Sequence, residues 1–532
     1  MTTFDFAVLA AYFVLIFAIG FSFARRDRSS KEYFLADRNV GWFAIGTSLF
    51  ATNISSEHFI GLAGSGATTG LAVGHFEWLA VFMVLTLGWV FTPFYLRSAV
   101  FTMPEFLERR YGPACRWYLT TVSVLAYIFT KISVSLYAGA LLLETLLGWD
   151  FYTSAVVMVL STGVYTVAGG LSAVIYTELV QAIILLGGAI ILTVLGLIEV
   201  GGWGALRAKV PPDFFSMIRP MNHPDFPWTG IFFGAPILGI WYWCTDQAMV
   251  QRVLGAKNET HARGGTILAG LLKITPVFVL VLPGLIAKAL YPDVTGDNAY
   301  PIMVLRLLPS GLTGLMVAAL MAALMSSLSA TFNSSSTLVT FDVYRKLRPA
   351  ATEKQLVRVG QLATVVMVVL GILWVPFIRT LSSQMFVYLQ SVSAYISPPI
   401  AVVFLFGVAW PRANYAGAVA ALASGAVLGT ARFVFEVMKA RPIVTDSPAL
   451  TWFVSVNFLH FAVLLFVIAT ALLVGVSLAT PPAPAGQLRG LTFRTLEGGY
   501  ASTDADRGVM RWQAVLSAAL MLSVIALWVI FR

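Results

Sequence analysis

Charged residues are scarce in this chain. Asp, Glu, Lys and Arg make up 11% of its 532 residues, whereas 58% are hydrophobic. A typical soluble domain has about 25% charged residues, so this shortage excludes a soluble globular protein. Cysteine is scarce too: Cys115 and Cys244 form no CxxC or Cys/His pattern, which argues against a disulfide framework or a zinc site. A Walker A sequence is also missing, so we expect no coupling to ATP.

Apolar runs of membrane-spanning length are abundant. Runs of about 20 apolar residues divide the chain into about fourteen expected transmembrane segments. We place these at 4–23, 42–70, 76–96, 117–147, 152–169, 173–199, 229–250, 264–289, 302–340, 359–378, 385–409, 414–435, 451–478 and 512–531. The first run has no basic stretch before it and no cleavage site, so we expect a retained helix rather than a signal peptide.

The positive net charge, +9 at pH 7, is concentrated in alternate loops. The basic residues of these loops are Arg25, Arg26, Arg28, Lys31, Arg38, Arg97, Arg109, Arg110, Arg116, Arg252, Lys257, Arg263, Arg345, Lys346, Arg348, Lys354 and Arg358. By the positive-inside rule these loops are cytoplasmic, and so is the polar loop near 480–510. The charge therefore reflects topology rather than nucleic-acid binding. We expect a multi-pass protein of the plasma membrane, the inner membrane in a bacterium, with both termini extracytoplasmic.

Two of the expected spans are interrupted by polar residues. The first interruption follows Ala51 and the second lies within Gly239–Leu254; their polar residues are Asn53, Ser55, Ser56, Glu57 and His58, and Thr245, Asp246 and Gln247. Unpaired backbone and ionisable groups are costly at membrane depth unless they face protein or a water-filled cavity. A pair of interrupted helices in corresponding positions of two halves is typical of inverted-repeat secondary transporters. We therefore expect an all-helical membrane protein that holds a polar ligand halfway across.

A third polar group lies in the apolar run AALMSSLSATF, where Ser326, Ser327 and Ser329 fall within one turn. Small residues of this kind are common where two membrane helices touch. Hydroxyl and carbonyl oxygens also suit a hard cation such as sodium. The residues alone leave both interpretations open.

Side chains that can donate and accept hydrogen bonds fall in several predicted spans. They are Asn53, His58, Glu77, Lys273 and Gln390, and together they offer what a polyhydroxyl ligand requires. The aromatic residues Phe76, Tyr242, Trp243 and Phe386 could stack on a sugar ring. Each residue also has an ordinary explanation: a helix-end carboxylate for Glu77, a structural ion pair for Lys273, and core packing for His58 and the rings.

Long motifs extend over nearly the whole chain: FATNISSEHFIGLAGSGA, GHFEW, YTVAGGLSAVIYTE, WYWCTDQAMVQR, LMSSLSATFNSSSTLVTFDVYRK and YLQSVSAYISPPIAVVFL. On these motifs the chain resembles the sodium/solute symporter family and, within it, the sodium/glucose cotransporters. The resemblance implies a LeuT-type core of two inverted five-helix repeats, residues 42–200 and 201–410, with broken first and sixth core helices. Residues 1–41 would add an extra helix and a cytoplasmic loop, and 411–532 further C-terminal helices.

The resemblance also implies roles for individual residues. Sodium would bind the backbone oxygens of Ala51, Ile54 and Ala323 and the hydroxyls of Ser326 and Ser327. The sugar would bind Asn53, His58, Glu77, Trp243, Lys273 and Gln390. The outer gate would be Leu62, Phe76 and Phe386, and the inner gate Tyr242.

A second sodium site is not favoured. In family members that have one, a further hydroxyl follows the serine pair and an Asp faces it, whereas here Ala330 follows Ser329 and the acid is Glu178. We expect one sodium per sugar, with Ser329 and Glu178 as a second-ion or ion-exit position.

The expected function is sodium-coupled uptake of a glucose- or galactose-type hexose by alternating access, without catalysis. Two alternatives remain. One is symport of another polar solute such as inositol, sialic acid, a nucleoside or an amino acid. The other is a sugar-gated sensor or ion leak.

Overall fold

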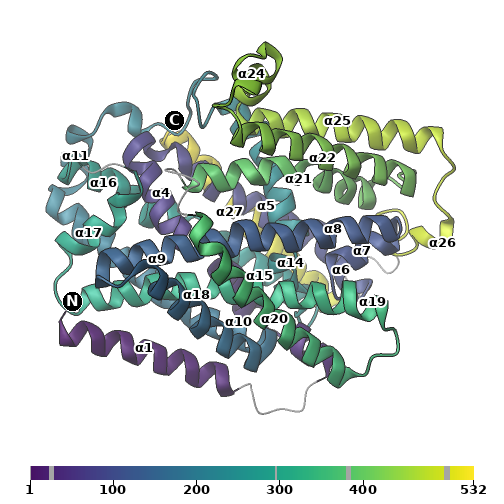
Figure 1. Ribbon diagram of the computed structural model, residues 1–532, viewed down its shortest axis with the longest axis horizontal. Coiled ribbons are helices and arrows are strands. Elements are labelled where there is room, and N and C mark those ends of the chain that lie inside the picture. The colour runs from purple at the N-terminus through teal and green to yellow at the C-terminus, as the bar shows by residue number, and fades with distance from the viewer. Residues whose placement is uncertain (1, 23–28, 294–295, 379–384, 497–503) are drawn as a thin grey trace.

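The computed structural model is a bundle of long helices (Figure 1), and it describes residues 2–22, 29–293, 296–378, 385–496 and 504–532. Within these ranges the secondary structure consists of helices and one isolated bridge, between Val40 and Ala256, without any strand. The predicted all-helical fold class is therefore confirmed. Three expected basic residues (Arg25, Arg26 and Arg28) and part of the polar loop before the last helix lie outside the described ranges.

The helices follow the apolar runs of the sequence. In the first half they are α1 (Thr3–Ser22), α2 (Ser30–Leu35), α3 (Trp42–Asn53), α4 (Ser56–Thr69), α5 (His75–Thr86), α6 (Thr92–Arg97), α7 (Met103–Arg110), α8 (Pro113–Ala126), α9 (Ser133–Leu147), α10 (Phe151–Val200), α11 (Gly202–Lys209), α12 (Trp228–Phe233), α13 (Ala235–Gly239) and α14 (Gln247–Leu254). In the second half they are α15 (Glu259–Leu272), α16 (Leu282–Leu290), α17 (Ala299–Leu307), α18 (Leu312–Leu338), α19 (Arg345–Leu347), α20 (Glu353–Ile378), α21 (Met385–Ala409), α22 (Tyr415–Val437), α23 (Pro442–Thr445), α24 (Pro448–Ser455), α25 (Phe458–Ala479), α26 (Ala485–Leu488) and α27 (Asp504–Ile530).

In the described ranges, 11 helical segments are long and apolar enough to cross a membrane, against the predicted number of about fourteen. The difference arises where expected spans are divided or joined. The second expected span is split into α3 and α4, and α4 runs on into the third as the segment Glu57–Arg97. The seventh is split into short pieces around α13 and α14. The number of crossings stays a prediction.

The fifth and sixth expected spans are joined in one helix, α10, which is kinked at Gly170. Gly170 has φ 60° and ψ −158°, a conformation that a residue with a Cβ rarely adopts. The carbonyl oxygen of Tyr33 would lie 2.6 Å from such a Cβ. The predicted boundary near residue 170 is therefore a kink within a helix rather than a loop.

The first predicted break lies between α3 and α4. Ile54 (φ −79°, ψ 110°) and Ser55 (φ −123°, ψ −177°) are extended, so the helix stops at Asn53 and starts again at Ser56. The Nδ1 atom of His58 accepts a hydrogen bond from the Ser55 N–H at 3.3 Å. His58 thereby satisfies a backbone donor that the break leaves without a helical partner.

The second break lies at Asp246, between the π-helical segment η6 (Ile240–Thr245) and α14. Asp246 has ψ 130°, and its carboxylate accepts a hydrogen bond from the Ala248 N–H at 2.9 Å. Asp246 therefore caps α14 as an ordinary N-cap residue does. Both breaks lie where the sequence predicts them.

Helix α18 lies at the centre of the bundle, in contact with α1, α3, α9, α10 and α20. Almost all of its residues from Met316 to Leu338 are buried, including the serine residues. Because α18 packs along α3, it brings Ser326 and Ser327 opposite the first break.

The two ends of the bundle hold different helices (Figure 1). Both chain termini lie at the end that holds α11, α16 and α17, whereas α6, α7, α19 and α26 lie at the other end. Arg97, Arg109 and Arg345 belong to this second end. The termini are thus separated from these basic residues in the structure; on which side of the membrane each end lies stays a prediction.

Candidate functional site

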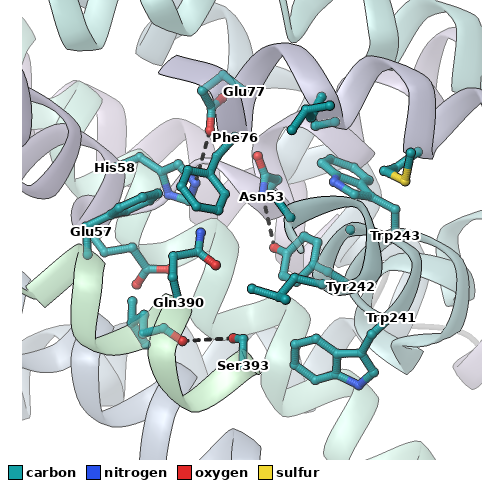
Figure 2. A pocket seen from close by; sticks show the side chains of 18 of the residues that line it. Asn53, Glu57, His58, Phe76, Glu77, Trp241, Tyr242, Trp243, Gln390 and Ser393 are labelled. Atoms are coloured by element: carbon teal, nitrogen blue, oxygen red, sulfur yellow. Dashed lines mark hydrogen bonds and ion pairs between the residues drawn. The ribbon is translucent and has the colours of Figure 1, made fainter. Parts of the chain in front are cut away.

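A cavity of about 120 Å³ lies between the two helix breaks (Figure 2). One buried water needs about 10–15 Å³ of such space, so the cavity accommodates several water molecules or polar groups of a small solute. Its walls come from α3, α4, α5, η4 (Tyr127–Ile132), α13, η6 and α21 and from the end of α15. The lining includes every side chain that the sequence assigns to the substrate: Asn53, His58, Glu77, Trp243, Lys273 and Gln390.

A chain of polar contacts crosses the cavity wall. The Lys273 ammonium forms an ion pair with Glu77 and donates to Asn53 Oδ1 at 2.5 Å. Asn53 Nδ2 donates in turn to the Tyr242 hydroxyl at 3.1 Å. The structural ion pair considered for Lys273 therefore exists, but it lies in the cavity wall and its partner is Glu77.

The expected aromatic gate residues are in contact with one another and with His58. The ring centroids of Phe76 and Phe386 lie 5.6 Å apart, and those of His58 and Phe386 lie 6.1 Å apart, both edge to face. His58 Nε2 also lies 3.8 Å from a Glu77 oxygen. Figure 2 shows Phe76 beside His58, with Glu77 beyond them.

Leu62, the third expected outer-gate residue, occupies a different position. It is fully buried in α4 and is not among the described side chains that line the cavity. Its neighbour Gly61 lies against Phe386, whose Cβ would be 2.8 Å from a Cβ on the glycine. α4 and α21 therefore touch directly beside the gate rings.

The expected sodium ligands lie where α18 meets the end of α3. The Ser326 hydroxyl donates to Ala51 O at 2.7 Å and lies 3.0 Å from Ala323 O. The Ser327 hydroxyl donates to Thr52 O at 3.2 Å. Carbonyls in the last turn of a helix lack helical partners, so the break frees these oxygens for the serine pair.

Two details of the expected sodium site differ. Thr52 contributes a carbonyl that the sequence does not assign, since a break exposes several successive carbonyls and the motif does not say which one meets Ser327. Ile54, by contrast, is the extended residue at the break, and the serine hydroxyls donate to Ala51 and Thr52 rather than to its carbonyl.

Glu178 and Ser329, the expected second-ion or ion-exit residues, have other partners. Glu178 forms an ion pair with Arg252 at 2.8 Å, and both side chains are fully buried. Thr52 and Ser48 also donate to its carboxylate. The Ser329 hydroxyl donates to Ser326 O, in its own helix, at 2.9 Å.

Two further charged residues line the cavity: Glu57, which the sequence analysis names only as part of the first interruption, and Lys131, which it missed. Lys131 pairs with Asp246 at 3.1 Å and lies 4.8 Å from the centroid of the Tyr242 ring. Glu57 accepts a hydrogen bond from Ser135 at 3.4 Å. The rule that an ionisable residue inside a membrane span marks a functional site would have identified Lys131 in its otherwise apolar run.

Comparison with known protein families identifies the family of this chain. The model of the sodium:solute symporter family matches residues 33–425. The chain belongs to this family. Among its relatives, the mouse sodium/glucose cotransporter 4 is 43% identical, over 93% of this chain and 78% of the relative. The mouse sodium/myo-inositol cotransporter is 41% identical, over 92% of this chain and 75% of the relative.

The fold agrees with a solved member of the same architecture. A Na+-coupled sialic acid symporter, in a substrate-bound outward-open state, superposes with a TM-score of 0.80 and 22% identity, over 91% of this chain and 99% of that one. The predicted LeuT-type helical fold is therefore confirmed. The protein is a multi-pass membrane transporter and not an enzyme, and sodium is its co-transported ion.

Proposed function

We propose that this symporter takes up a glucose- or galactose-type hexose, one sodium per sugar, by alternating access. The observation that carries the proposal is the convergence of amide, carboxylate and ammonium side chains on one cavity between two helix breaks. In this proposal the sugar contacts Asn53, His58, Glu77, Trp243, Lys273 and Gln390. The outer gate is Phe76 and Phe386, with the buried Leu62 of α4 as its third member outside the cavity lining, and the inner gate is Tyr242.

The chemistry of the cavity suits hydroxyl groups. A sugar hydroxyl both donates and accepts, and Asn53 and Gln390 can do the same through their amides. Glu77 accepts only and Lys273 donates only. Because these two already neutralise one another, the cavity presents hydrogen-bonding sites without demanding a charged ligand. Trp243 offers an apolar face that the carbon side of a sugar ring can cover.

Sodium would act through the junction of α3 and α18. The Ser326 and Ser327 hydroxyls hydrogen-bond to carbonyls of α3. A cation placed among these oxygens, together with those of Ile54 and Ala323, would bind both helices and hold them in one relative position. Each sodium that moves inward across 100 mV releases about 2.3 kcal/mol, enough for a roughly 50-fold sugar gradient.

Two observations support a single ion. The charge of Glu178 is already balanced by Arg252, and the Ser329 hydroxyl is bonded to its own helix. We therefore assign Ser329 and Glu178 to the path by which sodium leaves rather than to a second binding site.

The topology completes the proposal. We place the protein in the plasma membrane, or the inner membrane of a bacterium, with the end that holds both termini outside. Residues 42–200 and 201–410 would form the two repeats that move against one another, between the flanking segments 1–41 and 411–532.

The test is uptake of labelled glucose and galactose into proteoliposomes with an imposed sodium gradient, and a potassium gradient as control. We expect sodium-dependent accumulation that is lost in Ser327→Ala and in Gln390→Ala. If neither sugar accumulates while sodium still protects the protein against heat, the ion site stands and the hexose assignment fails.

Another polar solute is the main competing substrate, because a relative of similar identity is a myo-inositol cotransporter. Competition decides this: excess myo-inositol should inhibit galactose uptake only weakly. Stronger inhibition by myo-inositol than by glucose would replace the hexose assignment. Substrate-evoked current without accumulation would instead indicate a sugar-gated sensor or ion leak.

A further inference from the structure

The loop at residues 210–227 continues the aromatic contacts of the gate. It joins α11 to α12 at the end of the molecule that holds the termini (Figure 1). Its Phe226 is only 1% exposed, and its ring centroid lies 6.0 Å from that of Phe76, edge to face. Phe76 contacts Phe386, which contacts His58. An unbroken series of rings therefore leads from this loop to the cavity.

The loop is fastened to the outer end of α4. The buried Arg219 guanidinium donates to the carbonyl of Thr69, the last residue of α4, and pairs with Asp213 of the loop at 3.1 Å. Gly70, with φ +79°, follows α4, and the carbonyl oxygen of Phe214 would lie 2.3 Å from a Cβ there. A movement of the outer end of α4 must therefore move the loop with it.

A tight turn presents Phe226 to the gate. His223 Nδ1 accepts the backbone N–H groups of Asp225 at 3.3 Å and Phe226 at 3.0 Å. The His223 ring also stacks on Phe226, with centroids 6.1 Å apart and planes 17° apart. Asn457, just before α25, donates to Pro224 O at 2.7 Å. The turn is thus held by its own histidine and by a second helix.

We infer that Phe226 is a further residue of the outer gate, outside Phe76, and that loop 210–227 couples this gate to α4. The inference rests on the proposed function, in which Phe76 and Phe386 close the outer side. A solute that enters from this end must part those two rings. Phe226 packs against Phe76, so an outward turn of the Phe76 ring would have to displace Phe226, because protein interiors leave few voids.

In this inference Phe226 controls how easily the cavity is reached from outside and does not contact the solute. It is not among the described side chains that line the cavity. Removing its ring should therefore loosen the closed gate without removing a hydrogen bond to the solute.

The experiment measures how fast the cavity is reached from outside. The reporter is Ser393→Cys, a cavity-lining position, in a protein whose buried Cys115 and Cys244 are changed to Ser. A charged, membrane-impermeant thiol reagent is added to sealed right-side-out vesicles without substrate. Phe226→Ala should raise the labelling rate about tenfold, equivalent to about 1.4 kcal/mol lost from the closed state.

The matched control is Phe215→Ala. Phe215 belongs to the same loop and is 7% exposed, but its ring packs on Trp203, 5.5 Å away, instead of on the gate. We expect labelling in this variant within twofold of the parent rate. Phe226→Leu, which keeps much of the bulk and tolerates folding better, should give a smaller rise in the same direction.

Equal labelling in Phe226→Ala and its parent would overturn the inference, and so would an equal rise in Phe215→Ala. Because the reagent reports the path itself, the result does not depend on the substrate. If Phe226→Ala opens the path while neither hexose is transported, the gate residue stands and the proposed substrate fails.

Discussion

The two sides of the cavity differ in the chemistry of the contacts that flank them. Toward the end that holds the termini, rings of Phe76, Phe226 and Phe386 meet edge to face. Toward the basic loops, ion pairs join separate helices: the buried pairs are Arg252 with Glu178 and Arg116 with Asp342, and the partly buried pair is Lys131 with Asp246. Each ring contact contributes about 0.5–1.5 kcal/mol beyond the area it buries, whereas breaking a buried pair by removing one partner costs about 3–5 kcal/mol.

This difference suggests that the two sides have different roles. The aromatic side can open and close at low cost, as a gate for an arriving solute requires. The ionic side holds its helices in register and opens only when several pairs rearrange together. The following experiments test that contrast, starting with the largest expected effect.

Arg252→Leu should produce the largest loss of stability, because it leaves the Glu178 carboxylate buried without its partner. We expect a markedly lower Tm in detergent, equivalent to about 3–5 kcal/mol. The double variant Arg252→Leu/Glu178→Leu should recover most of the loss. As a control, Arg109→Ala breaks a pair whose arginine is 44% exposed and should cost about 1 kcal/mol or less. Similar Tm values for Arg252→Leu and Arg109→Ala would contradict the contrast.

Lys273→Met separates stability from transport. The single variant leaves Glu77 buried without its partner and should lower Tm. The double variant Lys273→Met/Glu77→Gln should regain Tm but lose sodium-driven hexose uptake by about 100-fold or more, since hydrogen bonds to charged groups contribute about 1.5–3 kcal/mol each. Uptake that returns together with Tm would mean that the pair is only structural.

Phe76→Leu should change access to the cavity without lowering Tm. It keeps an apolar side chain but loses two ring contacts, each contributing about 0.5–1.5 kcal/mol. We expect labelling of the Ser393→Cys reporter from outside to rise about five- to twentyfold while Tm stays close to the parent value. A large fall in Tm with unchanged labelling would show that the ring is structural rather than part of a gate.

A lower external pH should have the smallest effect on labelling of the reporter, and we expect this effect to arise from protonation of His223. Burial and then the neighbouring Arg219 lower the pKa of His223 below its usual value, with Asp225 acting in the opposite direction. The neutral ring accepts two backbone N–H groups, so the turn is most stable above the usual histidine pKa. That contribution is lost as the pH falls through the lowered pKa.

The measurement is reporter labelling at external pH 7.5 and pH 5. We expect a rise of about two- to threefold at the lower pH in the parent, compared with His223→Asn at the same two values so that the reactivity of the reagent cancels. Identical pH profiles in the two proteins would exclude His223 as the titrating group.

Much of the fold and of the site could be predicted from the sequence. Polar residues inside an apolar run mark both helix breaks, because the bilayer penalises them anywhere else. The side chains proposed to bind the substrate line one cavity with Phe76, and the serine pair lies opposite the first break; their roles stay predictions. The kink at Gly170 was also marked, but as a boundary, since composition does not distinguish a loop from a bend.

Other features depend on tertiary contacts that hydropathy does not encode. Nothing in the sequence says that Glu178 pairs with Arg252, that Thr52 rather than its neighbours faces Ser327, or that Leu62 is buried away from the cavity. Lys131 is different: its charge inside a span was visible, and only its partner Asp246 needed the structure.

Simultaneous measurement of labelled sodium and labelled galactose entering the same proteoliposomes tests the central claim most directly. The account predicts that both fluxes appear together, in a ratio near one, and that Ser327→Ala abolishes the galactose flux that sodium drives. Galactose entry at an equal rate in the absence of sodium, or sodium entry that galactose does not change, would contradict it.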